Sequence, residues 1–357
     1  MDIEKKIELV KKKPTIEVVG EHQLREVFEN YSHPKHYIGF EISGMAHLGT
    51  GLLTAVKIND FLKAGIKPMI FLADYHAWIN NKLGGDLKRI QRIATGYFKH
   101  AFISLGLTED KVKYILASKI YDNEYWKDVI NITRHTTINR MLRATAIMGR
   151  KESEAQHVSF LLYPAMQAAD IFKLDVQIAH SGIDQRKAHM LAKDVYDKIG
   201  KKNFVAVHTT LIPGLQGVTR MNPSEEDFIE AKMSKSKPES CIFIHDSEEE
   251  IKSKIGKAYC PPKIIEGNPI VSIAENLILR ERSLKIERPA KFGGDLEIEK
   301  YEELAKLYSE GKLHPLDLKN AVARELIRML EPSREYFSKN REYLEEIKEV
   351  GKVDKQQ

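Results

Sequence analysis

The chain has 357 residues, a length that exceeds one minimal domain and suits one large domain with a smaller one. Hydrophobic residues make up 42% and charged residues 30%, so a buried core is expected and global disorder is not. The formal net charge is +5, a mildly basic balance that permits a nucleic-acid partner without requiring one.

The two cysteines, Cys241 and Cys260, do not have the spacing of metal ligands. A disulfide scaffold is therefore not expected, whereas a reducing compartment is. No apolar run reaches the length that crosses a membrane, and the N-terminal residues are charged throughout, unlike a signal peptide. These features predict a soluble cytoplasmic protein that has no membrane partner.

The first part of the chain alternates between strand and helix patterns. Residues 1–35 have the pattern of short helices, with a break at Pro14. A strand is predicted over 36–43, and a helix is predicted from His47 onward. Residues 68–74 form a near-continuous apolar run, which is typical of a parallel strand that is buried on both faces.

A long helix at about 87–105 and a strand over 112–118 continue this alternation. The next residues, about 120–165, have a polar-rich helical pattern and are interpreted as an insertion. The sheet then resumes with predicted elements at 176–180 (strand), 186–199 (helix) and around Phe204 (strand). Repeated strand–helix units imply right-handed crossovers, so the predicted fold class is α/β, with a doubly wound, Rossmann-like parallel sheet.

From about Cys241 the pattern becomes mostly helical. A helix start is predicted at Asp246 or Ser247, because acidic residues follow in what would be the first turn. The predicted organisation is an N-terminal helical segment over 1–35, a catalytic domain with a helical insertion over 36–240, and an α-helical domain over 241–357.

A glycine-rich turn, GFEISGMAHLGTG, follows the first catalytic-domain strand. Such a turn can place helix N-terminal amides beside an anion, but its spacing does not fit the dinucleotide pattern G-x-G-x-x-G. His47 could donate to phosphate oxygens, and the missing side chain of Gly49 could let a base or ribose lie against the backbone. Alternatively, His47 caps the helix and Gly49 only relieves crowding.

The stretch EAKMSKSKPES, residues 230–240, concentrates lysines and serines. A mobile solvated loop explains this composition, and so does a loop that closes over several negative charges. Together with HLGT at 47–50, it resembles the signature motifs of class I aminoacyl-tRNA synthetases. KMSKS is complete at 232–236, whereas the usual H-x-G-H motif ends here in Thr50.

That resemblance implies amino-acid activation by in-line attack of a carboxylate on the α-phosphate of ATP, which is supplied with Mg²⁺. Such chemistry asks the protein mainly to position the reactants and to stabilise charge on the phosphates. The residues implied as catalytic are His47, Thr50, Lys232, Ser234 and Lys235. The residues implied in ATP binding are Gly39, His47, Gly49, Lys232 and Lys235, and no separate protein metal site is predicted.

The segment YPAMQAADIF carries three polar residues at helical spacing. Tyr163, Gln167 and Asp170 lie at i, i+4 and i+7, so they project from one face of a helix that is otherwise apolar. Pro164 is expected in the first turn of this helix. A polar surface stripe is the alternative, but an aspartate among apolar neighbours needs a partner, which favours a lined cavity.

Six segments carry a closer resemblance, to the tyrosyl-tRNA synthetases of the archaeal and eukaryotic type: YIGFEISG, FLADYHAW, YPAMQAAD, GIDQRKAHMLA, AKFGGD and LHPLDLKNAVA. The similarity extends from Tyr37 to about Glu331. It implies L-tyrosine and tRNA(Tyr) as further substrates, with Asp170 accepting a hydrogen bond from the substrate phenol beside Tyr37. The other implied tyrosine-binding residues are His76, Tyr163, Gln167 and Gln185. A tryptophan-specific relative is the alternative, and the Tyr37–Asp170 pair argues for tyrosine.

The same resemblance assigns two groups of tRNA-binding residues. Arg143, Arg186, Lys187 and Met190 would contact the first base pair of the acceptor stem, where Arg suits base edges and Lys suits phosphates. Phe292, His314 and Asp317 would hold the first anticodon base. From the residues alone, solvated cations, core packing of Phe292 and helix capping by His314 explain these positions equally well.

The family resemblance also implies a homodimer in which the inserted helices form much of the contact. Apolar residues available for this contact are Ile130, Ile132, Met141, Leu142 and Ile147, although they could equally be core residues. A non-catalytic RNA-binding relative is the second functional alternative, and Thr50 is the feature that favours it.

Overall fold

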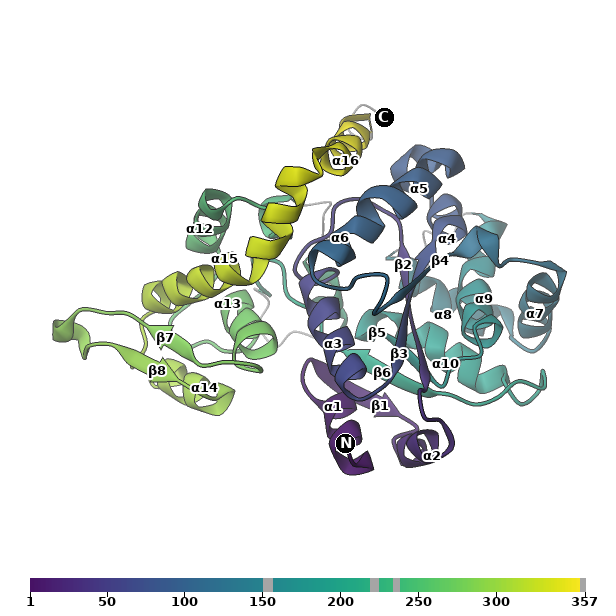
Figure 1. Ribbon diagram of the computed structural model, residues 1–357, viewed down its shortest axis with the longest axis horizontal. Helices are drawn as coiled ribbons and strands as arrows, with labels where there is room; N and C mark the ends of the chain where they lie inside the picture. The colour runs from purple at the N-terminus through teal and green to yellow at the C-terminus, as the bar shows by residue number, and fades with distance from the viewer. Residues whose placement is uncertain (150–156, 219–224, 234–237, 354–357) are drawn as a thin grey trace.

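The computed structural model describes residues 1–149, 157–218, 225–233 and 238–353. Figure 1 shows a large domain built around one twisted sheet and a smaller C-terminal domain beside it. The strands of the large sheet are β1 (Thr15–Val19), β2 (Lys35–Glu41), β3 (Lys67–Ala73), β4 (Lys113–Leu116), β5 (Ile178–Gly182) and β6 (Val205–Thr209).

The strand order is β1-β6-β5-β2-β3-β4. All neighbours pair in parallel except β1, which runs antiparallel to β6. The order reverses between β2 and β5, so the crevice of this doubly wound sheet opens at the carboxyl ends of those two strands. The α/β prediction is therefore confirmed. Six of the seven residues of β3 are buried, as its continuous apolar run predicts.

Helices cover both faces of the sheet. Those of the large domain are α1 (Ile3–Lys11), α2 (His22–Asn30), α3 (Leu52–Lys63), α4 (Asp74–Ile79), α5 (Leu87–Ile93), α6 (Lys99–Ser104), α7 (Asn123–Arg134), α8 (Ile138–Ala144), α9 (Val158–Lys173), α10 (Arg186–Val195) and α11 (Glu225–Glu230). A single π-turn, η2 (Ala94–Phe98), joins α5 to α6, so the long helix predicted here is present but irregular.

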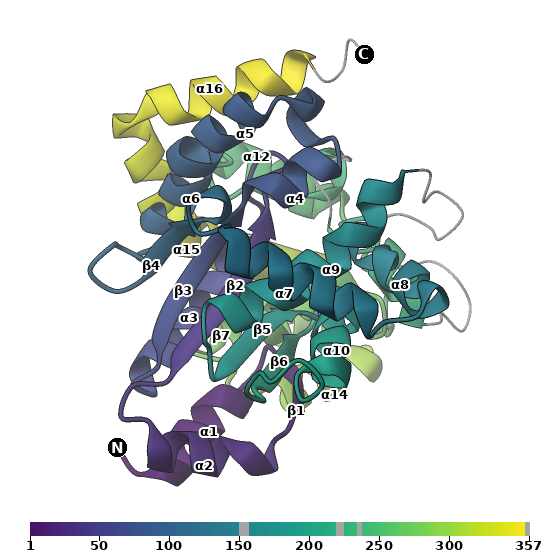
Figure 2. The same ribbon diagram turned by 90° about the vertical axis from the view of Figure 1, so that its right-hand side faces the viewer.

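The C-terminal domain is mostly helical but also contains a two-stranded ribbon. Its elements are α12 (Glu248–Lys257), α13 (Pro269–Ile273), β7 (Leu284–Ile286), β8 (Leu296–Ile298), α14 (Tyr301–Ser309), α15 (Pro315–Lys339) and α16 (Arg341–Val353). The predicted helix start at Ser247 is confirmed, because Ser247 and Glu250 form a reciprocal capping box. Helix α15 leads back to the large domain, where α16 lies along α5 (Figures 1 and 2).

Three local expectations were wrong. Residues 15–19 form β1 rather than helix, because this segment completes the sheet edge beside β6. Helix α3 begins at Leu52, so His47 lies in the preceding turn and not at the helix start. Pro164 lies inside α9, beyond its first turn.

The two domains share one hydrophobic core. Buried side chains of β2, α3 and α6 join those of α12, α13 and α15 in a single cluster, and the segment 241–244 lies within it. Within the described part of the chain, no helix combines the length and the apolar character needed to cross a bilayer.

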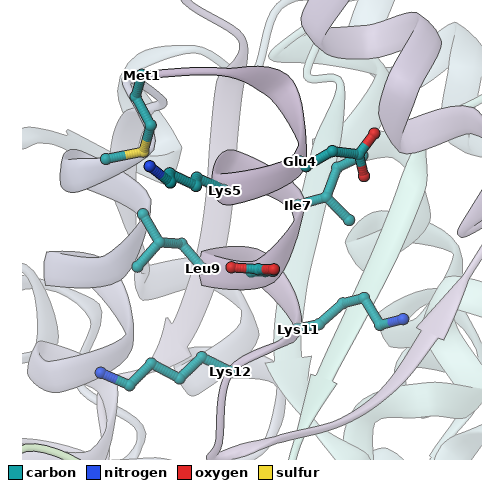
Figure 3. Close-up of a pocket in the computed structure, with 8 residues that line it drawn as sticks. Met1, Glu4, Lys5, Ile7, Leu9, Lys11 and Lys12 are labelled. Atoms are coloured by element: carbon teal, nitrogen blue, oxygen red, sulfur yellow. The ribbon is translucent and has the colours of Figure 1, made fainter.

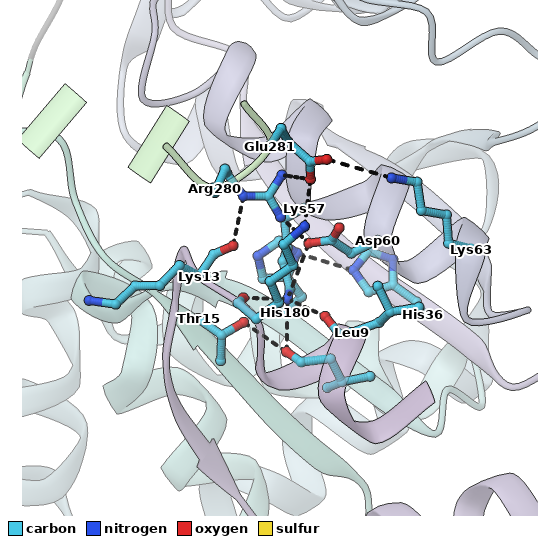
Figure 4. A network of polar contacts seen from close by, with 12 residues as sticks. Leu9, Lys13, Thr15, His36, Lys57, Asp60, Lys63, His180, Arg280 and Glu281 are labelled. Atoms are coloured by element: carbon cyan, nitrogen blue, oxygen red, sulfur yellow. Dashed lines mark hydrogen bonds and ion pairs between the residues drawn. The ribbon is translucent and has the colours of Figure 1, made fainter. Parts of the chain in front are cut away.

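A buried polar network joins the N-terminal segment, α3 and the C-terminal domain (Figure 4). The Lys57 side chain is fully buried, and its Nζ donates to the carbonyls of Leu9 and Val10 at 2.8 Å each and of Lys12 at 2.9 Å. Asp60, one turn along α3, is ion-paired with Arg280. Burial lowers the pKa of Lys57 to about 7, although the charge of Asp60 acts in the opposite direction.

We expect Lys57→Met to lower the free energy of unfolding by about 3–5 kcal/mol, because three buried carbonyls would lose the side-chain donor that they share. The folded-state pKa of Lys57 lies below its unfolded value, so the unfolded chain binds more protons between those two values. Lys57 therefore makes stability rise with pH, and the gap between parent and variant should widen from pH 7 to pH 10.

Denaturant unfolding of both proteins across this pH range measures the gap. Lys63→Met is the matched control, since Lys63 lies on the same helix, is 56% exposed and is 3.9 Å from its partner Glu281. A Lys57→Met variant as stable as the control at every pH would contradict the assignment.

Candidate active site

One pocket of the molecule lies away from the predicted site. It is a hollow along α1 (Figure 3), and its lining residues are Met1, Glu4, Lys5, Ile7, Glu8, Leu9, Lys11 and Lys12. None of the residues predicted to bind tyrosine or ATP is among them. The chemistry of the side chains therefore places the candidate site elsewhere, at the carboxyl edge of the sheet beside α9.

Helix α9 brings together the three polar residues that the spacing singled out. Tyr163, Gln167 and Asp170 are 5%, 9% and 1% exposed, so they form a buried polar face and not a surface stripe. The rings of His76 and Tyr163 pack perpendicular to each other, with centroids 4.5 Å apart and planes at 88°. His76 lies on α4, directly after β3, so two elements contribute to one wall.

Two tyrosines of the inserted region hold Asp170. The hydroxyls of Tyr121 and Tyr125 donate to the same oxygen, Asp170 Oδ1, at 2.9 and 3.1 Å. Their rings stack on each other, with centroids 3.8 Å apart and planes at 11°. Sequence reasoning missed both residues. Their i, i+4 spacing around the start of α7 was visible, but it did not identify their partner, which lies 45 residues or more along the chain.

The second oxygen of Asp170 is left open. Asp170 Oδ2 and His76 Nε2 are both buried and have no hydrogen-bond partner among the described residues. They lie 3.8 Å apart, too far for a hydrogen bond. Burial raises the pKa of Asp170 well above its usual value, while the two tyrosine hydroxyls counteract this, and burial lowers the pKa of His76 to about 3. A buried acceptor with an open lone pair is costly unless a donor arrives.

Tyr37 lies on β2 beside this carboxyl group. Its side chain is 1% exposed, and burial, followed by the charge of Asp170, raises the pKa of its hydroxyl. A Cβ at Gly39 would lie 2.5 Å from the Tyr37 hydroxyl oxygen. The absent side chain of Gly39 therefore gives the Tyr37 hydroxyl its space, a role separate from the predicted contact with ATP.

The carboxylate of Glu41, which sequence reasoning did not single out, contacts the hydroxyl of Tyr163. Glu41 Oε1 accepts from the Tyr163 hydroxyl at 3.3 Å and from Asn80 Nδ2 at 2.6 Å, and Lys82 Nζ lies 3.6 Å from its other oxygen. Gln185 Nε2 donates to the carbonyl of Ile147 at 3.0 Å. This wall is therefore anionic and contains amide groups, which suits a cationic amino group.

The turn that contains His47 is closely tied to the chain that follows the lysine motif. The N–H of Leu48 donates to the Ile242 carbonyl at 3.0 Å, and the N–H of Ile244 donates to the Ala46 carbonyl at 3.2 Å. Within the turn, the Gly49 N–H donates to His47 Nδ1 at 3.1 Å. The two signature segments are thus joined through backbone pairing.

Thr50 has a structural partner in this turn. Its Oγ1 accepts a hydrogen bond from the backbone N–H of His47 at 3.2 Å, so the hydroxyl stabilises the turn. The departure from the usual histidine therefore leaves an ordered turn around His47.

Lys232, the first lysine of the second motif, forms an ion pair with Asp184, which follows β5. Its neighbour Met233 is fixed by a hydrogen bond from its N–H to the Ile212 carbonyl at 2.8 Å. Ser234 and Lys235, the two other predicted catalytic residues of this motif, lie outside the described residues.

The predicted acceptor-stem residues gather around the start of α10. Arg186 Nε donates to both carboxylate oxygens of Glu17 on β1, at 2.8 and 3.0 Å. Lys187 and Arg143 are exposed, and Met190 is half-buried against the core. Arg143 and Lys187 thus present exposed cations, whereas Arg186 is held by a carboxylate.

The structure brings the predicted anticodon segments together through Arg288. Arg288 Nε donates to the carbonyl of Gly294 at 2.6 Å, and its Nη1 donates to the carbonyl of Lys312 at 3.0 Å. The turn after Phe292 therefore lies near the start of α15. His314 Nδ1 accepts from the Leu316 N–H at 3.1 Å, so His314 does cap the helix, and Asp317 is half-buried in the first turn.

The apolar residues considered for a dimer contact divide into two groups. Ile132, Met141 and Ile147 are at most 5% exposed and belong to the core. Ile130 is 59% exposed and Leu142 is half-buried. Two further exposed apolar residues, Ile138 at the start of α8 and Val158 at the start of α9, were not named by sequence reasoning.

Comparison with known proteins gives consistent matches. The family model described as tRNA synthetases class I (W and Y) matches residues 29–331. The tyrosine–tRNA ligases of Thermococcus kodakarensis and Thermococcus sibiricus are 52% and 51% identical, over 98% of this chain and 99% of theirs. The crystal structure of the Pyrococcus horikoshii tyrosyl-tRNA synthetase complexed with L-tyrosine superimposes with a TM-score of 0.92 at 50% identity, and covers 98% of this chain and 100% of that one.

These matches span nearly the whole chain, and they agree with the α9 face and the two signature segments. The chain belongs to the class I tRNA synthetases, and within them to the tyrosyl-tRNA synthetases of the archaeal and eukaryotic type.

Proposed function

We propose that this protein activates tyrosine with ATP, releasing pyrophosphate, and then transfers the tyrosyl group to the 3′ end of tRNA(Tyr). The observation that carries this proposal is the open oxygen of Asp170, which is buried and unpartnered among the described residues while Tyr121 and Tyr125 occupy the other oxygen. A substrate phenol supplies the missing donor.

The same geometry accounts for selectivity. Phenylalanine would fill the pocket but leave Asp170 Oδ2 without a donor, and tyrosyl-tRNA synthetases are an established example of discrimination by such unpaired groups. Tryptophan needs no acceptor for a phenol, and the curated relatives at about 50% identity are tyrosine–tRNA ligases. Tyr163, Gln167 and Gln185, together with Glu41, would receive the α-amino group.

ATP would lie across the carboxyl edge of the sheet. His47 would donate to its phosphates from a turn that Thr50 and Ile242 hold in place, with Gly39 and Gly49 leaving room for the nucleotide. Lys232 would leave its ion pair with Asp184 and bind the pyrophosphate instead. Lys235 and Ser234 would bind the same group. These groups act by positioning and by stabilising charge.

Mg²⁺ would arrive with ATP. Within the part of the chain that the structure describes, no group of three or more His, Cys, Asp or Glu residues could hold a metal ion. Magnesium bound to nucleotides takes most of its ligands from phosphates and water, so a small protein contribution fits this requirement. The ion would neutralise charge on the leaving pyrophosphate.

For tRNA(Tyr), Arg143, Arg186, Lys187 and Met190 are the proposed acceptor-stem residues, and Phe292, His314 and Asp317 the proposed anticodon residues. The exposed apolar residues Ile130, Ile138 and Val158 support a homodimer formed through the inserted helices. A cytoplasmic location accords with this role in translation. The non-catalytic alternative rested on Thr50, and the curated relatives at about 50% identity, which are tyrosine–tRNA ligases, favour the catalytic role.

The purified chain should catalyse ATP–pyrophosphate exchange that depends on tyrosine, because activation is reversible before transfer. Exchange should be far weaker with phenylalanine or tryptophan, which cannot donate to Asp170 in the same way. Absence of exchange with all three amino acids would leave only an RNA-binding role.

Asp170→Ala should lower kcat/KM for tyrosine in this assay by about 100-fold, through loss of a charge-assisted hydrogen bond. The KM for ATP should change little. Asp128→Ala is the matched control, because Asp128 is also buried but pairs with Lys201 at 2.6 Å, away from the pocket. Equal kcat/KM for tyrosine in Asp170→Ala and the parent would refute the assignment.

Asp317→Ala should lower kcat/KM for aminoacylation of tRNA(Tyr) by about 10-fold and leave tyrosine-dependent exchange intact, because the proposed contact is to an anticodon base. Glu302→Ala, in the first turn of α14, controls for loss of a helix N-terminal carboxylate. Loss of exchange in Asp317→Ala would show that the residue is structural instead.

A further inference from the structure

Tyr97 occupies an irregular point in the large domain. It is 0% exposed and lies in the π-turn between α5 and α6, a feature that is often found at functional sites. Gly96 next to it is where α16 approaches, since a Cβ there would lie 3.0 Å from Glu346 Oε2. The turn therefore lies between the sheet domain and the C-terminal helices.

The hydroxyl of Tyr97 contacts the turn that precedes α3. The backbone N–H of Ala46, the residue before His47, donates to the Tyr97 oxygen at 2.9 Å. His245 Nε2 lies 3.1 Å from the same oxygen. Because the oxygen accepts from Ala46, its own proton is free to be donated to His245.

The protonation state of His245 agrees with this arrangement. Burial lowers the pKa of His245 to about 4, so its imidazole is neutral near pH 7 and Nε2 can accept the hydroxyl proton. The hydrogen-bond chain thus runs from the Ala46 N–H through the Tyr97 hydroxyl to His245. Ala46 donates, the Tyr97 hydroxyl accepts once and donates once, and His245 Nε2 accepts.

The ring of Tyr97 contacts the C-terminal domain. It stacks on Phe337 of α15 with centroids 5.6 Å apart and planes at 28°, and His245 meets Phe337 edge-on at 5.6 Å. One side chain therefore touches the His47 turn through its hydroxyl and α15 through its ring. No other contact described above joins this turn directly to a helix of the C-terminal domain.

We propose that Tyr97 is a positioning residue for the nucleotide half of tyrosine activation. Its hydroxyl holds the Ala46–His47 backbone in position through the hydrogen bond from Ala46, and its ring holds the Tyr97 side chain against α15. The proposal rests on the proposed function, in which His47 contacts ATP phosphates. Because Tyr97 touches none of the residues around Asp170 described above, it acts on ATP and not on tyrosine.

The test is Tyr97→Phe, which keeps the ring and the stacking but removes the hydroxyl. We expect the KM for ATP in tyrosine-dependent exchange to rise about 10-fold, since Ala46 would lose its buried acceptor. The KM for tyrosine should stay within about 2-fold. Tyr308→Phe is the matched control: Tyr308 is also 0% exposed, and its hydroxyl donates to the Pro261 carbonyl at 2.9 Å inside the C-terminal domain.

An unchanged KM for ATP in Tyr97→Phe, or equal rises in both KM values, would overturn the proposal while leaving the proposed function intact. A parent protein without tyrosine-dependent exchange would overturn both. If Tyr97→Phe does not fold, His245→Leu decides, because it removes the acceptor of the hydroxyl proton while Tyr97 itself stays in place. A rise in the KM for ATP alone supports the proposal, and no change in it refutes the proposal.

Discussion

The candidate site depends on one buried carboxyl group whose two oxygens have different surroundings. Tyr121 and Tyr125 both donate to Asp170 Oδ1, while Oδ2 is a buried acceptor that the described protein does not satisfy. Burial makes the open acceptor costly, and a ligand hydroxyl removes that cost. A carboxyl group with both oxygens already bonded would lose this preference for a phenol.

The architecture places the turn that contains His47, the proposed phosphate-binding residue, just beyond the carboxyl end of β2. The residues that follow the lysine motif pair with the His47 turn through backbone hydrogen bonds, and the same segment belongs to the core that the two domains share. Lys57 and Arg280 also join α3, the helix after this turn, to the N-terminal and C-terminal segments. The His47 turn and the helix that follows it are therefore both held by contacts with the C-terminal part of the chain.

Much of the fold and part of the site could be predicted from the sequence, because those features depend on local spacing. The burial of β3 follows from its continuous apolar run, and the polar face of α9 follows from the helical period of 3.6 residues. Tyr121, Tyr125 and Glu41 could not be assigned in this way, since their roles come from partners distant in the chain. The sequence of β1 was interpreted as helix, because its strand structure depends on pairing with the distant β6. His47 lies in a turn and not in a helix, because segment 242–244 pairs with the residues on either side of it.

The central claim is that Asp170 Oδ2 accepts a hydrogen bond from the phenol hydroxyl of tyrosine. A crystal structure of this protein with bound L-tyrosine tests it most directly. The account predicts the phenol oxygen at about 2.6 Å from Asp170 Oδ2, with Tyr121 and Tyr125 still bonded to Oδ1. A tyrosine whose hydroxyl points away from Asp170, or an Oδ2 that is bonded to another protein group in that complex, would contradict it.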